Sequence, residues 1–306
     1  MTNVVIISML AAAVTAGTPV LFAALGEVLA ERAGILNLGV EGMMLMGAVV
    51  GFAVTMWTGN PTAGFVAAMA AGMCLGMVHG GLCISLRANQ VVAGMALTIF
   101  GMGLSGYLGK SLVGVPPVAR FSPVKLPLLG DIPILGPIFF QHDVLVYFSY
   151  LLVPALWYLV FRTRPGLHMR SVGENPRAAD VLGINVVRLR YLYTSVGGAL
   201  AGAGGAYLAL AYAPSWLENM TAGRGWIAIA LVIFSGWNPL VAMAGAYLFG
   251  GVEAASVRIQ AVGATINPYF LSMTPYLLTI LALILAGRSR RRAAPAALSV
   301  AYDREG

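Results

Sequence analysis

Ionisable side chains that interrupt apolar stretches are the residues of this chain best suited to chemistry. The run 26–43 places three carboxylates, one arginine and one asparagine between two apolar segments. A charged side chain at the centre of a bilayer costs about 2.5–3.5 kcal/mol on insertion scales. Glu41, which precedes the apolar residues 43–54, is therefore expected to face protein or a water-filled cavity. The alternative is that Glu31 and Arg32 form an interfacial pair and Asn37 caps a helix.

The glycines of the same run indicate a broken helix. Unwound backbone at membrane depth is tolerated where it is buried or lines a cavity, and transporters often place selective contacts there. We therefore assign Asn37, Glu41 and Gly42 to a candidate solute pathway.

A second polar segment, 218–226, leads into an apolar run that is too short to cross a bilayer alone. This pattern predicts an external loop that enters a half-helix, whose positive N-terminal end could meet a polar solute. Trp226 could stack on a planar base or a sugar face, or it could simply anchor the segment at the interface. Glu218, Asn219, Arg224 and Trp226 complete the candidate pathway.

Two isolated ionisable residues, His79 and Glu253, lie within apolar segments. They could belong to a proton path, but proton relays usually form chains, so hydrogen bonding across helices is the favoured interpretation. Cys74 and Cys83 lie nine residues apart in one apolar segment. A disulfide within one helix cannot span that separation, and no histidine has ligand spacing, so we predict no metal site.

The segment 106–111 resembles the end of a phosphate-binding loop, but Leu104 stands where that motif requires glycine. The segment also ends an apolar helix instead of following a strand. We expect no ATP or other cofactor to bind this chain.

A short segment inside the long basic interruption 162–190 has the pattern of an exposed helix. Pro176 suits a first helical turn and Asn175 suits the cap before it. Since the rest of the chain is apolar, this segment is where the protein is expected to meet a cytosolic partner. The residues assigned to this contact are Gly173, Glu174, Asn175, Pro176, Arg177, Ala178, Ala179, Asp180 and Gly183.

The elements that position these groups are membrane-spanning helices. Of the 306 residues, 59% are apolar and 9% are charged, and the mean hydropathy is +0.85. This composition excludes a soluble globular protein and predicts an all-α polytopic membrane protein. We predict eight spans, with a ninth, short apolar run at 226–237. The predicted spans are Val4–Leu25, Val40–Thr58, Ala63–Leu86, Val91–Leu108, Val144–Phe161, Tyr191–Ala213, Leu240–Val257 and Thr274–Ala286.

The positions of the arginines indicate which side of the membrane each loop faces. Six lie in the interruption 162–190 and four more lie between 288 and 292, and the positive-inside rule places both groups in the cytoplasm. Nine crossings then put the N-terminus outside, and the first span is expected to be a retained helix. We expect one membrane domain, 1–287, that contains the cytoplasmic loop 162–190, followed by a basic cytoplasmic tail, 288–306.

Two further patterns concern packing. Six prolines in the outer segment 109–143 favour a stiff, extended cover over a helix. Gly72, Gly76 and Gly80 recur every four residues, as do Gly198 and Gly202, which predicts close helix packing.

Several separated motifs resemble one family of membrane proteins. The segment Gly173–Asp180, followed by Val181-Leu182-Gly183-Ile184-Asn185, resembles the coupling loop of ATP-binding-cassette (ABC) importer permeases. The segment from Glu31 to Met43, together with Arg224-Gly225-Trp226-Ile227-Ala228 and Gly236-Trp237-Asn238-Pro239, resembles the branched-chain amino acid and simple-sugar permease superfamily, in particular its nucleoside-uptake branch. The chain departs from ribose-type members, since Leu36-Asn37-Leu38-Gly39-Val40-Glu41 replaces an Ile-Asp-Leu-Ser-Val-Gly element.

The resemblance implies a type II-like bundle in the bacterial cytoplasmic membrane and a set of partners. They are cytosolic ATPase subunits that hold ATP and magnesium, a second permease subunit, identical or distinct, and an external solute-binding lipoprotein. The solute would be a nucleoside, or in the closest alternative a simple sugar. The chain itself would be neither an enzyme nor a nucleic-acid binder, and its surface would contact lipid. A proton-driven carrier, suggested by His79 and Glu253, and an intramembrane enzyme are the remaining classes. For an intramembrane enzyme, the sequence lacks a paired catalytic set.

Overall fold

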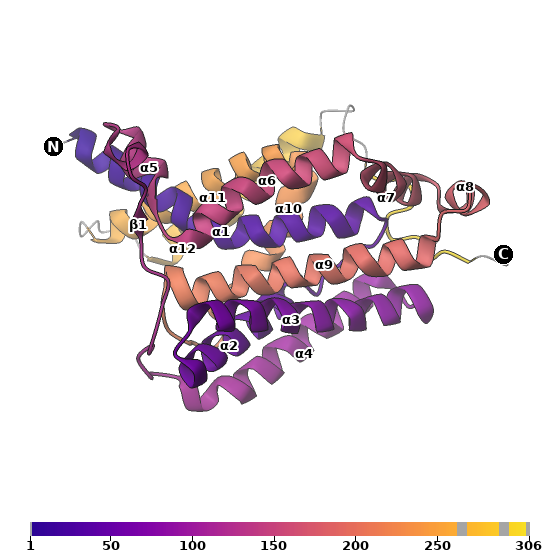
Figure 1. Ribbon diagram of the computed structural model, residues 1–306, viewed down its shortest axis with the longest axis horizontal. Coiled ribbons are helices and arrows are strands. Elements are labelled where there is room, and N and C mark those ends of the chain that lie inside the picture. The colour runs from indigo at the N-terminus through magenta and orange to yellow at the C-terminus, as the bar shows by residue number, and fades with distance from the viewer. Residues whose placement is uncertain (1, 262–267, 288–293, 304–306) are drawn as a thin grey trace.

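A computed structural model describes residues 2–261, 268–287 and 294–303 of the chain, and these residues form a bundle of helices (Figure 1). The all-α polytopic prediction is confirmed. The helices are α1 (Thr2–Arg32), α2 (Val40–Thr58), α3 (Pro61–Gly80), α4 (Gln90–Gly109), α5 (Leu135–Phe139), α6 (Val144–Arg162), α7 (Arg164–Glu174), α8 (Pro176–Val181), α9 (Val186–Tyr207), α10 (Arg224–Ser235), α11 (Pro239–Ala261) and α12 (Pro268–Gly287). The π-helical turns η1 (Gly81–Ser85) and η4 (Leu208–Tyr212) extend α3 and α9, and the short 3₁₀ turns η2 (Lys110–Leu112) and η3 (Leu129–Asp131) lie in the outer segment.

Seven helices within the described ranges are long and apolar enough to cross a membrane. The eighth predicted span corresponds to α12, a helix of 20 residues, and the short ninth run corresponds to α10, with 12 residues. The main difference lies in α1, which has 31 residues and is thus about 46 Å long. It continues past the predicted end at Leu25 because protein contacts satisfy its polar residues, as described below.

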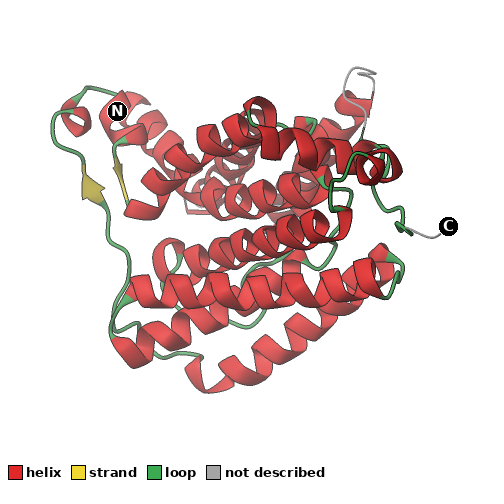
Figure 2. Cartoon of the chain, turned by 45° about the vertical axis from the view of Figure 1, so that its right-hand side comes forward, coloured by secondary structure: helices red, strands yellow, loops and turns green. Residues whose placement is uncertain are grey.

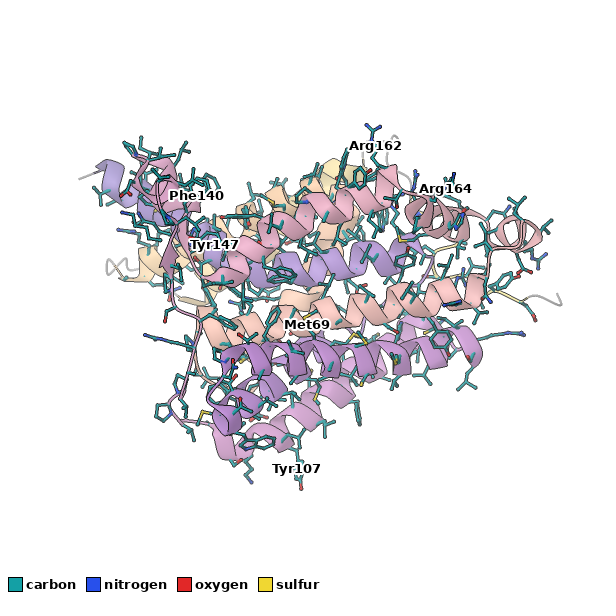
Figure 3. The ribbon with its side chains drawn as sticks, viewed as in Figure 1. Met69, Tyr107, Phe140, Tyr147, Arg162 and Arg164 are labelled. Carbon is teal, nitrogen blue, oxygen red and sulfur yellow. The ribbon has the colours of Figure 1, made fainter. Side chains whose placement is uncertain are left out.

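The two ends of the bundle differ in charge and structure. The N-terminus, α5 and β1 lie at one end, whereas α7, α8 and the C-terminus lie at the other (Figure 1). Arg162 and Arg164 lie at the α7 end, and Phe140 and Tyr147 lie at the opposite one (Figure 3). By the positive-inside rule the α7 end is cytoplasmic, which agrees with the predicted outer N-terminus. The arginines between 288 and 292 lie outside the described residues.

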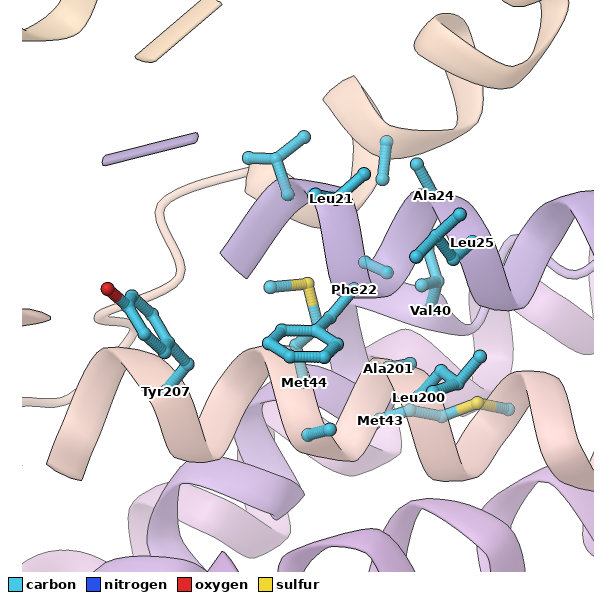
Figure 4. Close-up of a cluster of buried hydrophobic side chains, with 14 of the residues drawn as sticks. Leu21, Phe22, Ala24, Leu25, Val40, Met43, Met44, Leu200, Ala201 and Tyr207 are labelled. Atoms are coloured by element: carbon cyan, nitrogen blue, oxygen red, sulfur yellow. The ribbon is translucent and has the colours of Figure 1, made fainter. Parts of the chain in front are cut away.

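The core of the bundle is built around α9, which is almost completely covered by other helices. Leu21 and Phe22 of α1, Met43 and Met44 of α2, and Leu200 of α9 form part of one buried cluster (Figure 4). The predicted glycine packing is confirmed in the contact between α3 and α9. A Cβ on Gly72 would lie 2.1 Å from the carbonyl oxygen of Gly198, and one on Gly202 would lie 2.3 Å from that of Ala68. Backbone contact this close excludes larger residues.

Polar caps determine where several helices begin. Side-chain oxygens of Asn60, Asn89 and Asp143 accept hydrogen bonds from the first free N–H groups of α3, α4 and α6. Asn185 caps α9 in the same way. Each cap satisfies N–H groups that have no partner within the helix.

The outer segment is only partly the extended cover that its prolines predict. Residues 113–123 are mostly irregular, but β1 (Val124–Lys125) pairs antiparallel with β2 (Gln141–His142), and α5 lies between the strands (Figure 2). The short helix fits because a Cβ on Gly136 would meet the backbone of Gly130 at 2.4 Å. This turn could not be recognised from the proline pattern.

Candidate functional site

The first polar cluster lies at the N-terminus of the half-helix α10. The Glu41 side chain is buried in α2, and its Oε1 accepts hydrogen bonds from the Thr221 hydroxyl at 2.5 Å and from the Gly223 N–H at 2.8 Å. Its Oε2 accepts the Gly225 N–H at 2.6 Å. A carboxylate here satisfies free N–H groups and complements the positive end of the helix dipole. In this conformation Glu41 occupies this end, so the expectation that it meets a solute directly stays a prediction.

The C-terminus of α10 is held by the other end of the same polar run. Arg32 donates hydrogen bonds to the carbonyl oxygens of Gly236, at 3.2 Å, and Trp237, at 3.4 Å. The Trp237 indole N–H donates to Oε2 of Glu31 at 2.5 Å. A cation at the carbonyl end complements the negative end of the helix dipole. Glu31 and Arg32 are therefore anchors of α10, and the alternative of an interfacial ion pair is not what the structure shows.

Asn37 lies in the irregular chain between the two anchors and is bound within the protein. Its side-chain amide donates to Oε1 of Glu27 at 2.9 Å, and its Oδ1 accepts the Gly39 N–H at 3.0 Å. Glu27, Asn37 and Glu41 are almost completely buried. Since the chain between α1 and α2 is irregular, the Asn37 side chain supplies an acceptor for a backbone N–H that lacks a helical partner.

Arg224 and Glu253 form a second polar cluster beside the N-terminus of α10. They are ion-paired, and Tyr212 donates a hydrogen bond to Oε1 of Glu253 at 3.2 Å. Arg224 also lies over the Tyr212 ring, 5.9 Å from its centroid. Glu253 is thus engaged with an arginine and a tyrosine, as the hydrogen-bonding interpretation predicts.

A cleft of about 260 Å³ opens beside this ion pair, between α10, α11 and α12. Its polar lining includes Arg224, Glu253 and Tyr276, and its apolar lining includes Phe249 and Leu271. Ligand pockets commonly measure roughly 300–1,000 Å³ and combine apolar walls with a few polar groups. The cleft is thus small but has the mixed lining of a site for a small amphipathic solute.

The remaining residues of the predicted pathway lie in different surroundings. Glu218 and Asn219 are exposed in the loop before α10, and Trp226 is 39% exposed. Gly42 instead packs against α4, because a Cβ there would lie 2.7 Å from the Leu97 carbonyl oxygen. The structure thus groups Arg224 and Glu41 at the N-terminus of α10, leaves the loop residues at the surface and places Gly42 in helix packing.

His79 lies apart from Glu253 in the hydrogen-bond network. Its Nε2 lies 3.0 Å from the carbonyl oxygen of Leu36, in the irregular chain between α1 and α2. The Cys83 sulfur lies 3.5 Å from the same ring nitrogen. The favoured interpretation, hydrogen bonding across helices, holds for Glu253, whereas His79 bonds the irregular chain between α1 and α2.

The cytoplasmic end carries the predicted short helix as α8, which directly follows α7. The Asn175 side chain accepts the Ala178 N–H at 3.0 Å, and Pro176 occupies the first turn. Gly183, with φ of +81°, ends this element in open space. Gly173 is buried, and a Cβ there would lie 2.1 Å from the Arg32 carbonyl oxygen. The end of α7 therefore contacts the end of α1, the helix that anchors α10.

The outward side of α8 is apolar and flanked by two grooves. Val181 is 87% exposed and Leu182 is 78% exposed. One groove runs along Leu167, Leu182 and Leu192, and the other runs along Arg87, Asp180 and Tyr302. Glu174, Arg177 and Ala178 are also exposed, whereas Ala179 packs inward against Val172 and Val186. Exposed large apolar side chains rimmed by polar groups are typical of a protein-binding surface.

Comparison with known proteins identifies the family. Residues 9–294 match the permease component of the branched-chain amino acid transport system. The chain belongs to this family. It is a permease component, and a multi-pass protein of the cytoplasmic membrane.

Three relatives of the permease match over nearly their whole length. A protein of Haloferax volcanii named as a glucose ABC transporter permease, TsgC13, is 43% identical over 97% of this chain and 98% of its own. The guanosine ABC transporter permease NupQ of Bacillus subtilis is 36% identical over 93% and 92%. The nucleoside ABC transporter permease NupC of Lactococcus lactis is 36% identical over 88% of each chain.

A solved structure supports the fold of the permease. An inward-facing metal-chelate-type ABC transporter has a TM-score of 0.53 at 15% identity, over 91% of this chain and 85% of the solved one. At this identity the likeness concerns the fold alone.

Sequence reasoning missed Thr221 and Gly225 as partners of Glu41 in the permease. Both lie about 180 residues from Glu41 along the chain, and no pattern within a short stretch of sequence predicts a contact over that separation. The sequence did contain a clue to this contact. A buried carboxylate such as Glu41 requires hydrogen-bond donors, and the N-terminus of a half-helix offers free N–H groups.

Proposed function

We propose that this permease is the membrane subunit of an ABC importer that takes up nucleosides. The observation that carries the proposal is the 36% identity to both NupQ and NupC over most of the chain. The cleft beside Arg224 also fits a nucleoside, because it offers an aromatic wall next to an ion pair. Phe249 and Tyr276 could contact a base, while Arg224 and Glu253 could hydrogen-bond sugar hydroxyls.

A simple sugar is the second candidate, and a specific observation favours it. The 43% identity to TsgC13 connects this chain to a protein named for glucose transport. Sugars and nucleosides both present hydroxyl groups, so the ion pair could serve either. The aromatic lining of the cleft is what favours a solute with a planar base.

The predicted pathway residues divide into two roles in this proposal. Arg224 and Trp226 lie on or beside the half-helix and would meet the solute, with Glu218 and Asn219 at the outer entrance. Asn37, Glu41 and Gly42 would hold the half-helix and its neighbours in place. A solute pathway beside a half-helix held by buried polar groups is consistent with how irregular backbone is tolerated at membrane depth.

The cytoplasmic contact is proposed to be the ATPase docking site. Val181 and Leu182 would insert into the ATPase subunit, and the polar residues Glu174, Arg177 and Asp180 would form the rim. Gly173, Asn175, Pro176, Ala178, Ala179 and Gly183 would give α8 its shape. ATP and magnesium would be bound by the ATPase, while a second permease subunit and an external solute-binding lipoprotein complete the transporter.

Competition in intact cells tests the solute. A host strain that lacks the chain is complemented with the wild type. Uptake of radiolabelled guanosine is measured in the presence of excess adenosine, ribose or glucose, and uptake of radiolabelled glucose is measured separately. We expect complementation to restore guanosine uptake, with inhibition by adenosine and none by ribose or glucose. Restored glucose uptake without guanosine uptake would replace the nucleoside proposal with the sugar alternative.

A further inference from the structure

The C-terminal segment 294–303 lies across the cytoplasmic end of the bundle and takes no part in the proposed solute pathway. It follows α12 in the sequence and runs near α7, α8 and the end of α9 (Figure 1). Irregular tails that make no contacts are usually poorly ordered. This tail instead contacts five parts of the protein: the end of α7, the chain just beyond α1, α9, the turn before α4 and the inward side of α8.

The first contacts are with the end of α7. The Ala297 N–H donates to the Gly173 carbonyl oxygen at 2.9 Å, and the Ala296 N–H donates to Oε2 of Glu174 at 3.2 Å. Ala297 is only 5% exposed. Its carbonyl oxygen would lie 3.3 Å from a Cβ on Gly34, just beyond α1. The tail thus lies against the junction of α7 and α1, directly before α8.

The second contact is with α9. Arg190 is 1% exposed, and its Nη1 donates to the Val300 carbonyl oxygen at 3.2 Å. A buried guanidinium is costly unless it is hydrogen-bonded. The tail backbone therefore supplies one hydrogen-bond acceptor to this guanidinium, whose Nε and Nη2 have no hydrogen-bond partner among the described residues.

The third contact is with the turn before α4. Arg87 donates to both carboxylate oxygens of Asp303, at 2.5 and 2.7 Å. A two-bond pairing of this kind fixes orientation as well as distance. Tyr302, next in the chain, packs with Val172 and Ala179 against the inward side of α8. The tail thus joins α8 to α1, to the turn before α4 and to α9.

We propose that residues 294–303 act as a strap that ties α8 to the cytoplasmic ends of α1, α4 and α9. A push on α8 then moves these helices together instead of bending the α7–α8 segment. The inference rests on the proposed function, because it takes α8 as the element that receives the ATPase motion. The strap is a positioning element and makes no contact with the solute.

The test measures uptake and ATP hydrolysis together in the complete transporter, reconstituted in proteoliposomes. The variants are Arg87→Glu, Asp303→Arg and the charge-swapped double variant. We expect each single variant to lower the ratio of solute transported to ATP hydrolysed by several-fold with the subunits still assembled. The double variant is expected to recover most of that ratio, because the pair can re-form with reversed charges.

Two controls make the outcome specific. Lys125→Glu breaks the Lys125–Asp131 pair, which is similarly exposed but lies at the outer end, and is expected to leave the ratio unchanged. Val181→Asp alters α8 with the strap intact and is expected to abolish ATPase docking. If Val181→Asp uncouples while the Arg87 and Asp303 variants retain the wild-type ratio, the strap is refuted and the docking proposal stands. If Val181→Asp leaves docking and uptake intact, the docking proposal itself fails.

Discussion

The carboxylate of Glu41 is predicted to decide whether the half-helix α10 stays in place. Replacing Glu41 with alanine removes the acceptor of the Thr221 hydroxyl and of two backbone N–H groups, those of Gly223 and Gly225. The hydroxyl can rotate to another acceptor, but the N–H groups cannot. The variant therefore leaves unsatisfied donors in a buried place.

The magnitude follows from these contacts. A buried donor left without its partner costs about 1–3 kcal/mol, and the loss of a helix cap costs about 0.5–2 kcal/mol. The contributions overlap, so Glu41→Ala is expected to destabilise the position of α10 by about 3 kcal/mol. Glu41→Gln retains one acceptor oxygen and is expected to cost about half as much.

Hydrogen–deuterium exchange of the purified protein, followed by mass spectrometry, measures this effect locally. A change of about 3 kcal/mol corresponds to roughly 100-fold faster exchange for amides of α10, if they exchange through local opening. Glu218→Gln is the matched control, since it removes an exposed carboxylate from the loop that precedes the same helix. Unchanged exchange across α10 in Glu41→Ala would refute the anchoring role of Glu41.

Two further predictions follow from the cytoplasmic side. Arg32→Ala removes the donor to the last carbonyl groups of α10. We expect faster hydrogen exchange in the final turn of α10, at a cost of about 1–2 kcal/mol. Wild-type protection of that turn would contradict this prediction. Gly173→Val should prevent stable folding, because its Cβ would overlap the Arg32 backbone, whereas Gly183→Ala meets open space and should cost only about 1 kcal/mol from its positive φ. Thermal unfolding in detergent compares the two variants, and equal losses would show that backbone contact is not the cause.

The sequence predicted the helices well because lipid imposes a simple constraint. Apolar stretches of about 20 residues must become spans, and α2 begins and ends at the predicted residues, Val40 and Thr58. The end of α1 was placed seven residues too early, at Leu25, since Glu27, Glu31 and Arg32 look unsuited to a membrane helix. Only the partners of these side chains, which are distant in sequence, make the longer helix possible.

The candidate site was predictable in its parts but not in its assembly. Burial of Glu41 and a half-helix at α10 followed from the cost of charge and from segment length. Their direct contact did not follow, because nothing local links residue 41 to residues 221–225. Helix α8 was predictable because Asn175 and Pro176 form a local cap signal. Its contact with the tail, through Ala179 and Tyr302, was not predictable, because no local pattern links residues so distant in the chain.

Vesicles that contain this permease with or without its ATPase subunits test the account most directly. Nucleoside accumulation inside proteoliposomes is measured with the solute-binding protein on the outer side, and ATP is enclosed in the lumen. The account predicts accumulation against a gradient only when the second permease, the ATPase and ATP are all present. Accumulation by vesicles that hold this chain alone, without ATP, would contradict it.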